Sequence, residues 1–116
     1  MAFADAMRGL VSVFRSERNF RVHSALAITV VALGFLFRVS PGEWIALVLS
    51  IGFVMAAEVL NTAIEYLSDA LHPEMDAGIR KTKDAAAGGV LVASVAAAVV
   101  GAIVFLPEVW ELLSKS

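Results

Sequence analysis

The residues of this chain best suited to chemistry are four polar side chains within one otherwise apolar segment. Glu58, Asn61, Glu65 and Asp69 follow the spacing i, i+3, i+7 and i+11. At about 100° per residue, a helix places all four within roughly 60° of one another on one face. A carboxylate deep in a bilayer costs at least about 2.5 kcal/mol, so several on one face indicate a shared function. The structural alternative is a hydrogen-bonded seam between helices, which a lone Asn would fit best.

These groups permit phosphoryl transfer, which needs a metal on the phosphates, a cation facing them and an acceptor for the proton of the attacking hydroxyl. Magnesium prefers oxygen ligands, often one or two carboxylates with substrate phosphates, and Glu17 and Glu65 are the candidate ligands. Lys83 and Arg18 are candidate phosphate-facing cations. Glu58 is the deepest carboxylate and suits a general base for a hydroxyl that emerges from the bilayer. No G-x-x-x-x-G-K-[ST] sequence occurs, so a nucleotide site here is not a P-loop.

Composition indicates a single membrane-embedded domain over residues 1–116. The chain is 59% hydrophobic and its mean hydropathy is +0.83, well above ordinary soluble usage. A formal net charge of −2 argues against a nucleic-acid partner, which would favour a basic chain. The absence of cysteine excludes disulfides, zinc–thiolate sites and thiol nucleophiles.

Hydropathy and periodicity predict an all-α integral membrane protein with one surface helix and three spans. The surface helix is amphipathic and expected to lie on the membrane. The expected elements are the surface helix at 2–17 and spans at 22–39, 44–71 and 84–106. A tight turn is predicted at Ser40-Pro41-Gly42, and Pro107 is expected to end the third span.

The basic residues predict the orientation of these spans. Three spans place the N-terminus and residues 72–83 on one side, together with seven of the nine Lys and Arg residues. Those seven are Arg8, Arg15, Arg18, Arg21, Arg80, Lys81 and Lys83. Positively charged segments stay inside, so this side is predicted to be cytoplasmic. Glu65 and Asp69 then lie near the cytoplasmic interface, where ATP is available.

Several motifs resemble the small prokaryotic diacylglycerol kinase family of integral membrane lipid kinases. The stretch Glu58-Val-Leu-Asn-Thr-Ala-Ile-Glu65-Tyr-Leu-Ser-Asp69 is similar to the family pattern E-x-x-N-[ST]-A-I-E-x-x-x-D. Lys83-Asp84-Ala-Ala-Ala-Gly88 is similar to its K-D-x-x-[AS]-[AG] element. Glu17-Arg-Asn-Phe-Arg-Val-His23 and Arg8-Gly9-Leu10 resemble the elements before the first span. The resemblance covers nearly the whole chain.

The resemblance implies a kinase of the bacterial inner membrane with its active site at the cytoplasmic face. Glu58 would be the catalytic base, and Glu17 and Glu65 would hold the Mg²⁺ of Mg-ATP. The implied nucleotide-binding residues are Arg8, Glu17, Asn61, Glu65, Asp69, Lys83 and Asp84. The family implies a homotrimer with sites shared between subunits. Similarity to its Gram-positive branch favours undecaprenol as the lipid alcohol, with diacylglycerol as the alternative.

Two other interpretations are weighed against this one. His23 and His72 are candidate acid–base groups, but without further metal-type ligands at helical spacing, packing or hydrogen bonding is the simpler role. In a different class, the carboxylates could belong to a non-enzymatic oligomeric scaffold or a cation-conducting assembly. ATP-dependent labelling of a lipid alcohol separates an enzyme from either assembly.

Overall fold

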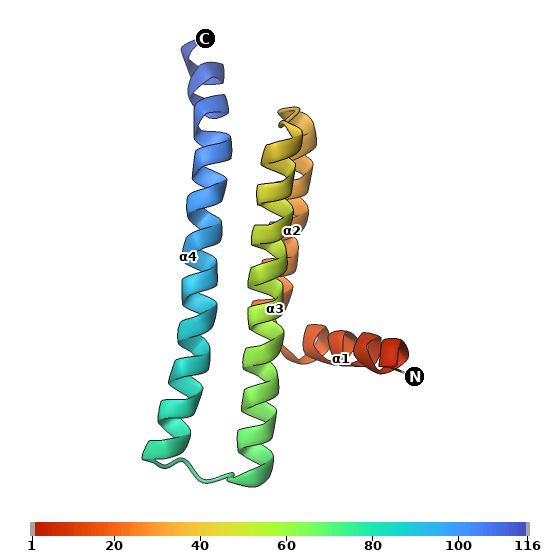
Figure 1. Cartoon of the computed structure of the whole chain (residues 1–116), viewed down its shortest axis with the longest axis vertical. Helices are drawn as coiled ribbons and strands as arrows, with labels where there is room; N and C mark the ends of the chain where they lie inside the picture. The colour runs from red at the N-terminus through yellow and green to blue at the C-terminus, as the bar shows by residue number, and fades with distance from the viewer. Residues whose placement is uncertain (1, 116) are drawn as a thin grey trace.

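The computed structural model describes residues 2–115, which form four helices joined by short links (Figure 1). The helices are α1 (Ala2–Ser16), α2 (Arg18–Leu36), α3 (Pro41–Leu71) and α4 (Ala77–Ser114). α3 packs against both α2 and α4, and α1 projects from the side of this bundle (Figure 1). At about 1.5 Å per residue, α4 has a length of about 57 Å, which matches the longest extent of the molecule, 58 Å.

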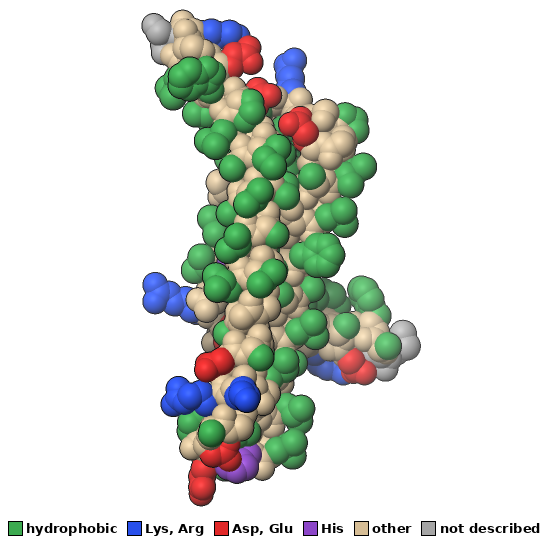
Figure 2. All heavy atoms as spheres, turned by 60° about the vertical axis from the view of Figure 1, so that its left-hand side comes forward, with side chains coloured by type: hydrophobic (Ala, Val, Ile, Leu, Met, Phe, Trp, Pro, Cys, Tyr) green, Lys and Arg blue, Asp and Glu red, His purple; other side chains and the backbone are tan. Residues whose placement is uncertain are grey.

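The three long helices expose their apolar side chains to the surroundings. Each of α2, α3 and α4 is long and apolar enough to cross a membrane. Ile28, Phe53 and Ile103, one on each helix, are 72%, 69% and 69% exposed. In Figure 2, hydrophobic side chains cover the middle of the visible face, while charged side chains gather towards its two ends. A soluble monomer rarely exposes apolar surface on this scale, so the prediction of three apolar spans is confirmed and lipid is the natural solvent.

The link between α2 and α3 also forms the small buried core at the end of the bundle away from α1. Arg38 adopts a left-handed conformation with φ of 53°. The backbone N–H of Val39 then donates to the carbonyl of Gly34 at 3.1 Å, the bond that closes a Schellman motif. This turn directs Val39 inward, where it packs with Leu47 of α3 and Val104 of α4.

The tight turn predicted at Ser40-Pro41-Gly42 is wrong, because these residues begin α3. The hydroxyl of Ser40 accepts a hydrogen bond from the backbone N–H of Glu43, and the Glu43 side chain accepts one from the backbone N–H of Ser40. This reciprocal pair is a capping box. Pro41 occupies the first helical position, where its fixed φ fits and its missing N–H would have no partner.

α4 begins earlier than the sequence predicts. The carboxylate of Asp76 accepts a hydrogen bond from the backbone N–H of Ile79 at 2.8 Å and caps the helix. The link to α3 is therefore only residues 72–76. The basic residues that the sequence places in a loop over 72–83 lie instead on the first turns of α4, where Lys83 has a fixed position on a helix face.

The prediction that Pro107 ends the last helix is wrong. α4 continues through Pro107 to Ser114, beyond the predicted span of 84–106. A proline inside a helix removes one backbone hydrogen bond but does not require the chain to leave the helix. The other predicted elements, 2–17, 22–39 and 44–71, correspond to α1, α2 and α3 with shifts of a few residues at their ends.

Two sets of contacts fix the position of α1 against the bundle. The guanidinium Nη1 of Arg21 donates to the carbonyl oxygens of Phe14 at 2.8 Å and Arg15 at 3.0 Å. A cation at the last carbonyls of a helix satisfies groups that have no partner within the helix. The hydroxyl oxygens of Ser16 and Tyr66 lie 2.6 Å apart in a hydrogen bond. The end of α1 is thereby joined to α3 at the level of the polar stripe, which is the face of α3 that carries Glu58, Asn61, Glu65 and Asp69.

Candidate active site

Glu58 is the most deeply buried member of the polar stripe. It lies on α3, roughly 25 Å from the first residue of that helix at about 1.5 Å per residue. Glu58 is only 4% exposed, and its Oε1 is 3.2 Å from Nε2 of His23 on α2. Thr62, one turn further along α3, is 2% exposed. The structure therefore holds this carboxylate buried between two helices, α2 and α3.

Asn61 and Glu65 form the middle of the stripe. The side-chain amide Nδ2 of Asn61 donates to Oε1 of Glu65 at 2.8 Å. The other end of the Asn61 amide, Oδ1, is buried and has no hydrogen-bond partner within the described part of the chain. A buried acceptor without a donor is costly and calls for an explanation. A bound cation beside the Glu65 carboxylate would satisfy it.

Asp69 and Lys83 join α3 to α4 at the end of the stripe. The Nζ of Lys83 lies 2.7 Å from Oδ1 of Asp69, although the two residues are far apart in the sequence. Asp69 is exposed while Lys83 is half-buried, so the pair faces water on one side. Asp84 follows Lys83 on α4 and is exposed. The structure thus brings together two of the residues that the sequence assigns to a nucleotide site, Asp69 and Lys83.

Glu17 is positioned indirectly by the hydrogen bond between α1 and α3. Ser16 and Tyr66 form that bond, Glu17 follows Ser16, and Glu65 precedes Tyr66. The two predicted metal ligands therefore lie on chain segments that are held side by side. Glu17 is half-buried and, although it occupies the position before α2, its side chain makes no capping hydrogen bond. The Glu17 carboxylate therefore does not cap α2.

Not every predicted residue joins this cluster within one chain. Arg8 lies on the exposed face of α1, where it forms an ion pair with Asp5 rather than with the stripe. Among residues 2–115, no group of three or more His, Asp or Glu side chains is arranged to hold a metal ion.

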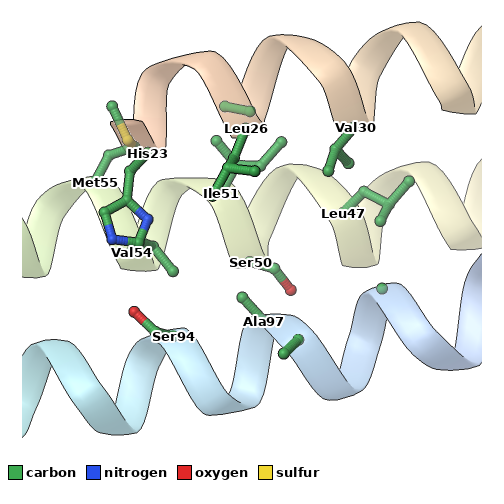
Figure 3. Close-up of a pocket in the computed structure, with 13 residues that line it drawn as sticks. His23, Leu26, Val30, Leu47, Ser50, Ile51, Val54, Met55, Ser94 and Ala97 are labelled. Atoms are coloured by element: carbon green, nitrogen blue, oxygen red, sulfur yellow. The ribbon is translucent and has the colours of Figure 1, made fainter. Parts of the chain in front are cut away.

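An apolar groove runs between α2, α3 and α4 and ends at His23 (Figure 3). Its volume is about 360 Å³. Leu26, Val30, Leu47 and Val54 contribute to its walls, and the small side chains of α4 leave the space open. Figure 3 shows the His23 ring extending from α2 into the space between the helices. His23 therefore lies between the groove, which it lines, and the buried Glu58 carboxylate, which it contacts.

Residues 4–105 of this chain match the family described as prokaryotic diacylglycerol kinase. The chain belongs to the prokaryotic diacylglycerol kinase family. It is 40% identical over 107 residues to an undecaprenol kinase of Bacillus subtilis, which covers 92% of this chain and 87% of that one. It is 33% identical over 114 residues to a diacylglycerol kinase of Synechocystis, covering 97% of this chain and 65% of the relative. A diacylglycerol kinase of Haemophilus influenzae is 32% identical over 88 residues, which cover 76% and 75% of the two chains.

Membership of the prokaryotic diacylglycerol kinase family makes this protein a lipid kinase and a membrane protein, as the motifs predicted. A kinase of this family catalyses phosphoryl transfer, so the alternative of a non-enzymatic scaffold or ion-conducting assembly does not describe it. The geometry is compatible with that chemistry, because a buried carboxylate adjoins an apolar groove and acidic and basic groups continue from it to the exposed end of α3.

Sequence reasoning missed three residues that contact or adjoin the candidate site residues. His23 was assigned to packing or hydrogen bonding, with no partner named, and it contacts the deepest carboxylate. Ser16 and Tyr66 were not singled out, and they join α1 to α3. Single polar residues on separate helices carry no periodic signal, so only the packing of α1, α2 and α3 identifies their partners.

Proposed function

We propose that this lipid kinase transfers the γ-phosphoryl group of ATP to the hydroxyl of undecaprenol, giving undecaprenyl phosphate. The observation that carries the proposal is the buried Glu58 carboxylate, which contacts His23 in the lining of an apolar groove. The identity of 40% to an undecaprenol kinase supports the same acceptor. Diacylglycerol, giving phosphatidic acid, is the second candidate, because two relatives are diacylglycerol kinases.

In the proposed reaction, Glu58 accepts the proton of the lipid hydroxyl. The hydroxyl oxygen then forms a bond to the γ-phosphorus of ATP as the bond from that phosphorus to the bridging oxygen breaks, and ADP leaves. Surrounding helices exclude water from the buried carboxylate, which limits transfer of the phosphoryl group to water. Lys83, positioned by Asp69, provides a cation for the phosphates near the exposed end of α3.

Mg²⁺ fits the oxygen groups present. Glu65, together with the buried Oδ1 of Asn61 that has no other described partner, would hold it with Glu17 from the neighbouring segment. When bound with ATP, the ion would neutralise phosphate charge. The hydrogen bond from Asn61 to Glu65 orients both side chains, so the carboxylate keeps a second oxygen for the metal. Arg8 and Asp84 would complete the nucleotide site from α1 and α4.

A homotrimer with shared sites is part of the proposal. The exposed apolar side chains of α3 and α4 support it, since partner subunits as well as lipid would cover them. Arg8 does not reach the polar stripe of its own chain. In the trimer it would contribute to the nucleotide site of a neighbouring subunit. The exposed apolar side chains of α1, including Phe3, Met7 and Phe14, would lie in the membrane surface.

The acceptor is tested by comparing undecaprenol and diacylglycerol with purified protein in mixed micelles and radiolabelled ATP. We expect kcat/KM for undecaprenol to exceed that for diacylglycerol by at least about tenfold, because an apolar groove discriminates by the chains it can bury. Ala97→Leu, which narrows the groove, should raise KM for the lipid, while Ala96→Leu at the exposed neighbouring position should not. A preference for diacylglycerol would select the second candidate, and labelling of neither lipid would refute both.

The proposed location is the bacterial inner membrane, with the active site at the cytoplasmic face. Because the chain contains no cysteine, a single introduced cysteine is the only residue of the protein that a maleimide labels, and it reports the topology directly. Gly42→Cys, at the exposed start of α3, should react with a membrane-impermeant maleimide on intact cells. Met75→Cys, in the link between α3 and α4, should react only after permeabilisation. The reverse labelling pattern would place the nucleotide site outside and contradict the proposal.

A further inference from the structure

The contact between His23 and Glu58 is a polar pair at the centre of an apolar environment. The Nε2 of His23 on α2 is 3.2 Å from Oε1 of Glu58 on α3. The Glu58 side chain is 5% exposed and that of His23 is 24% exposed. A buried carboxylate without a partner is strongly unfavourable, so the imidazole has a direct effect on where the carboxylate lies.

The contact with His23 involves one oxygen of the Glu58 carboxylate, Oε1. With its proton on Nε2, a neutral imidazole is within the distance at which a ring N–H donates to Oε1 of Glu58. Oε2 is then the oxygen that can receive a proton from a substrate. The position of Oε2 is set by α2 and α3 together, because each helix supplies one member of the pair.

His23 also borders the space that the lipid would enter. It lines the apolar groove, together with Leu26 and Val54, and its ring projects into the space between the helices (Figure 3). The polar side chains that share this lining are the hydroxyls of Ser50 and Ser94. A hydroxyl at the end of a lipid chain in the groove would therefore lie beside His23, the residue that contacts Glu58.

We infer that His23 is a positioning residue, which holds the Glu58 carboxylate in the orientation that accepts the proton of the lipid hydroxyl. This inference rests on the proposed function, and in particular on Glu58 as the base. During the reaction the proton moves from the lipid oxygen to Oε2 of Glu58. His23 keeps its own proton on Nε2 throughout and stays bonded to Oε1. A misplacement of about 1 Å at a reacting group can cost about 100-fold in rate, so the loss of this contact should be visible in turnover.

The test compares the purified full chain and four variants of it, with Mg-ATP and whichever lipid alcohol the parent phosphorylates. His23→Leu should lower kcat by about 10- to 100-fold without changing KM for Mg-ATP. His23→Gln, whose amide nitrogen reaches about as far as Nε2, should retain kcat within a few-fold of the parent. His23→Asn is one bond shorter and should resemble His23→Leu. The matched control is Thr29→Val. The Thr29 hydroxyl lies on the same helix and donates to the backbone carbonyl of Ala25, one turn earlier in α2.

The decisive measurement repeats His23→Leu in the Glu58→Gln background. If His23 acts through Glu58, the second change should lower the residual kcat by less than about threefold, because groups that act as a unit are not additive. An additive loss in that background would overturn the inference, as would a His23→Leu enzyme within twofold of the parent. If His23→Leu does not fold, as judged by gel filtration in detergent, the Gln and Asn variants decide, and equal kcat values for the two would overturn it. A parent that phosphorylates no lipid alcohol refutes the proposed function itself, so the two failures are distinguishable.

Discussion

Glu58→Gln is expected to lower kcat for the lipid alcohol by about 10²- to 10⁴-fold, the contribution of a positioned general base. The amide keeps the size of the carboxylate but cannot accept the proton of the hydroxyl. Glu58 is buried between α2 and α3, whereas the groups assigned to the nucleotide lie nearer the exposed end of α3. Affinity for Mg-ATP should therefore change little, and the variant should bind nucleotide without turning it over.

Turnover and nucleotide affinity should be measured on the same preparation of the Glu58→Gln enzyme, after gel filtration in detergent confirms its assembly. Glu43→Gln is the matched control, because Glu43 lies on the same helix and serves the capping box of α3. It is expected to affect thermal stability and to leave kcat unchanged. If Glu58→Gln loses stability while each folded molecule keeps a turnover within a few-fold of the parent, the carboxylate is structural and the reaction relies on positioning and metal alone.

Glu65→Gln is expected to lower kcat/KM for Mg-ATP by about 10²- to 10³-fold, the effect of removing one group that stabilises developing charge. The substituted amide oxygen can still accept the hydrogen bond from Asn61, so the local helix structure should persist. The variant loses the negative charge of Glu65, and magnesium prefers charged carboxylate oxygens as protein ligands. Glu17→Gln should reduce kcat/KM in the same way, since Glu17 follows Ser16, which is hydrogen-bonded to Tyr66 next to Glu65.

The measurement is the dependence of initial rate on Mg²⁺ at fixed ATP, which should shift to higher concentration in both variants. Glu74→Gln provides a control on the same side of the molecule, because Glu74 is an exposed carboxylate in the link between α3 and α4. Parent-like Mg²⁺ and ATP dependence in both Glu17→Gln and Glu65→Gln would refute their role as ligands. A shift in Glu65→Gln alone would restrict the metal site to α3.

The stripe on α3 could be predicted from sequence because it depends only on helical periodicity. Once residues 44–71 are read as a helix, the spacing of Glu58, Asn61 and Glu65 places them on one face whatever lies nearby. The number of spans follows from the lengths of the apolar segments, since a bilayer core of about 30 Å sets the length that each needs. Both predictions agree with the helices observed.

Helix ends were less predictable, because each depends on hydrogen bonds within a few residues. Ser40 and Pro41 read as a turn, yet the reciprocal bonds with Glu43 make them the start of α3. Pro107 reads as a stop, yet α4 continues because one missing backbone bond is a small part of a helix of 38 residues. The S-x-x-E spacing was the available signal for the first of these.

The amino-acid sequence by itself determined the number of spans, their lipid-suited composition and the polar face of α3, because these are properties of single helices. Only the tertiary structure decided which side chains meet across helices. The pairing of His23 with Glu58, of Lys83 with Asp69 and of Ser16 with Tyr66 depends on how each helix is rotated and where each link turns. Periodicity fixes the face on which a residue lies but contains no information about the neighbouring helix that covers it, and this is why the partner of the buried carboxylate had to come from the packing.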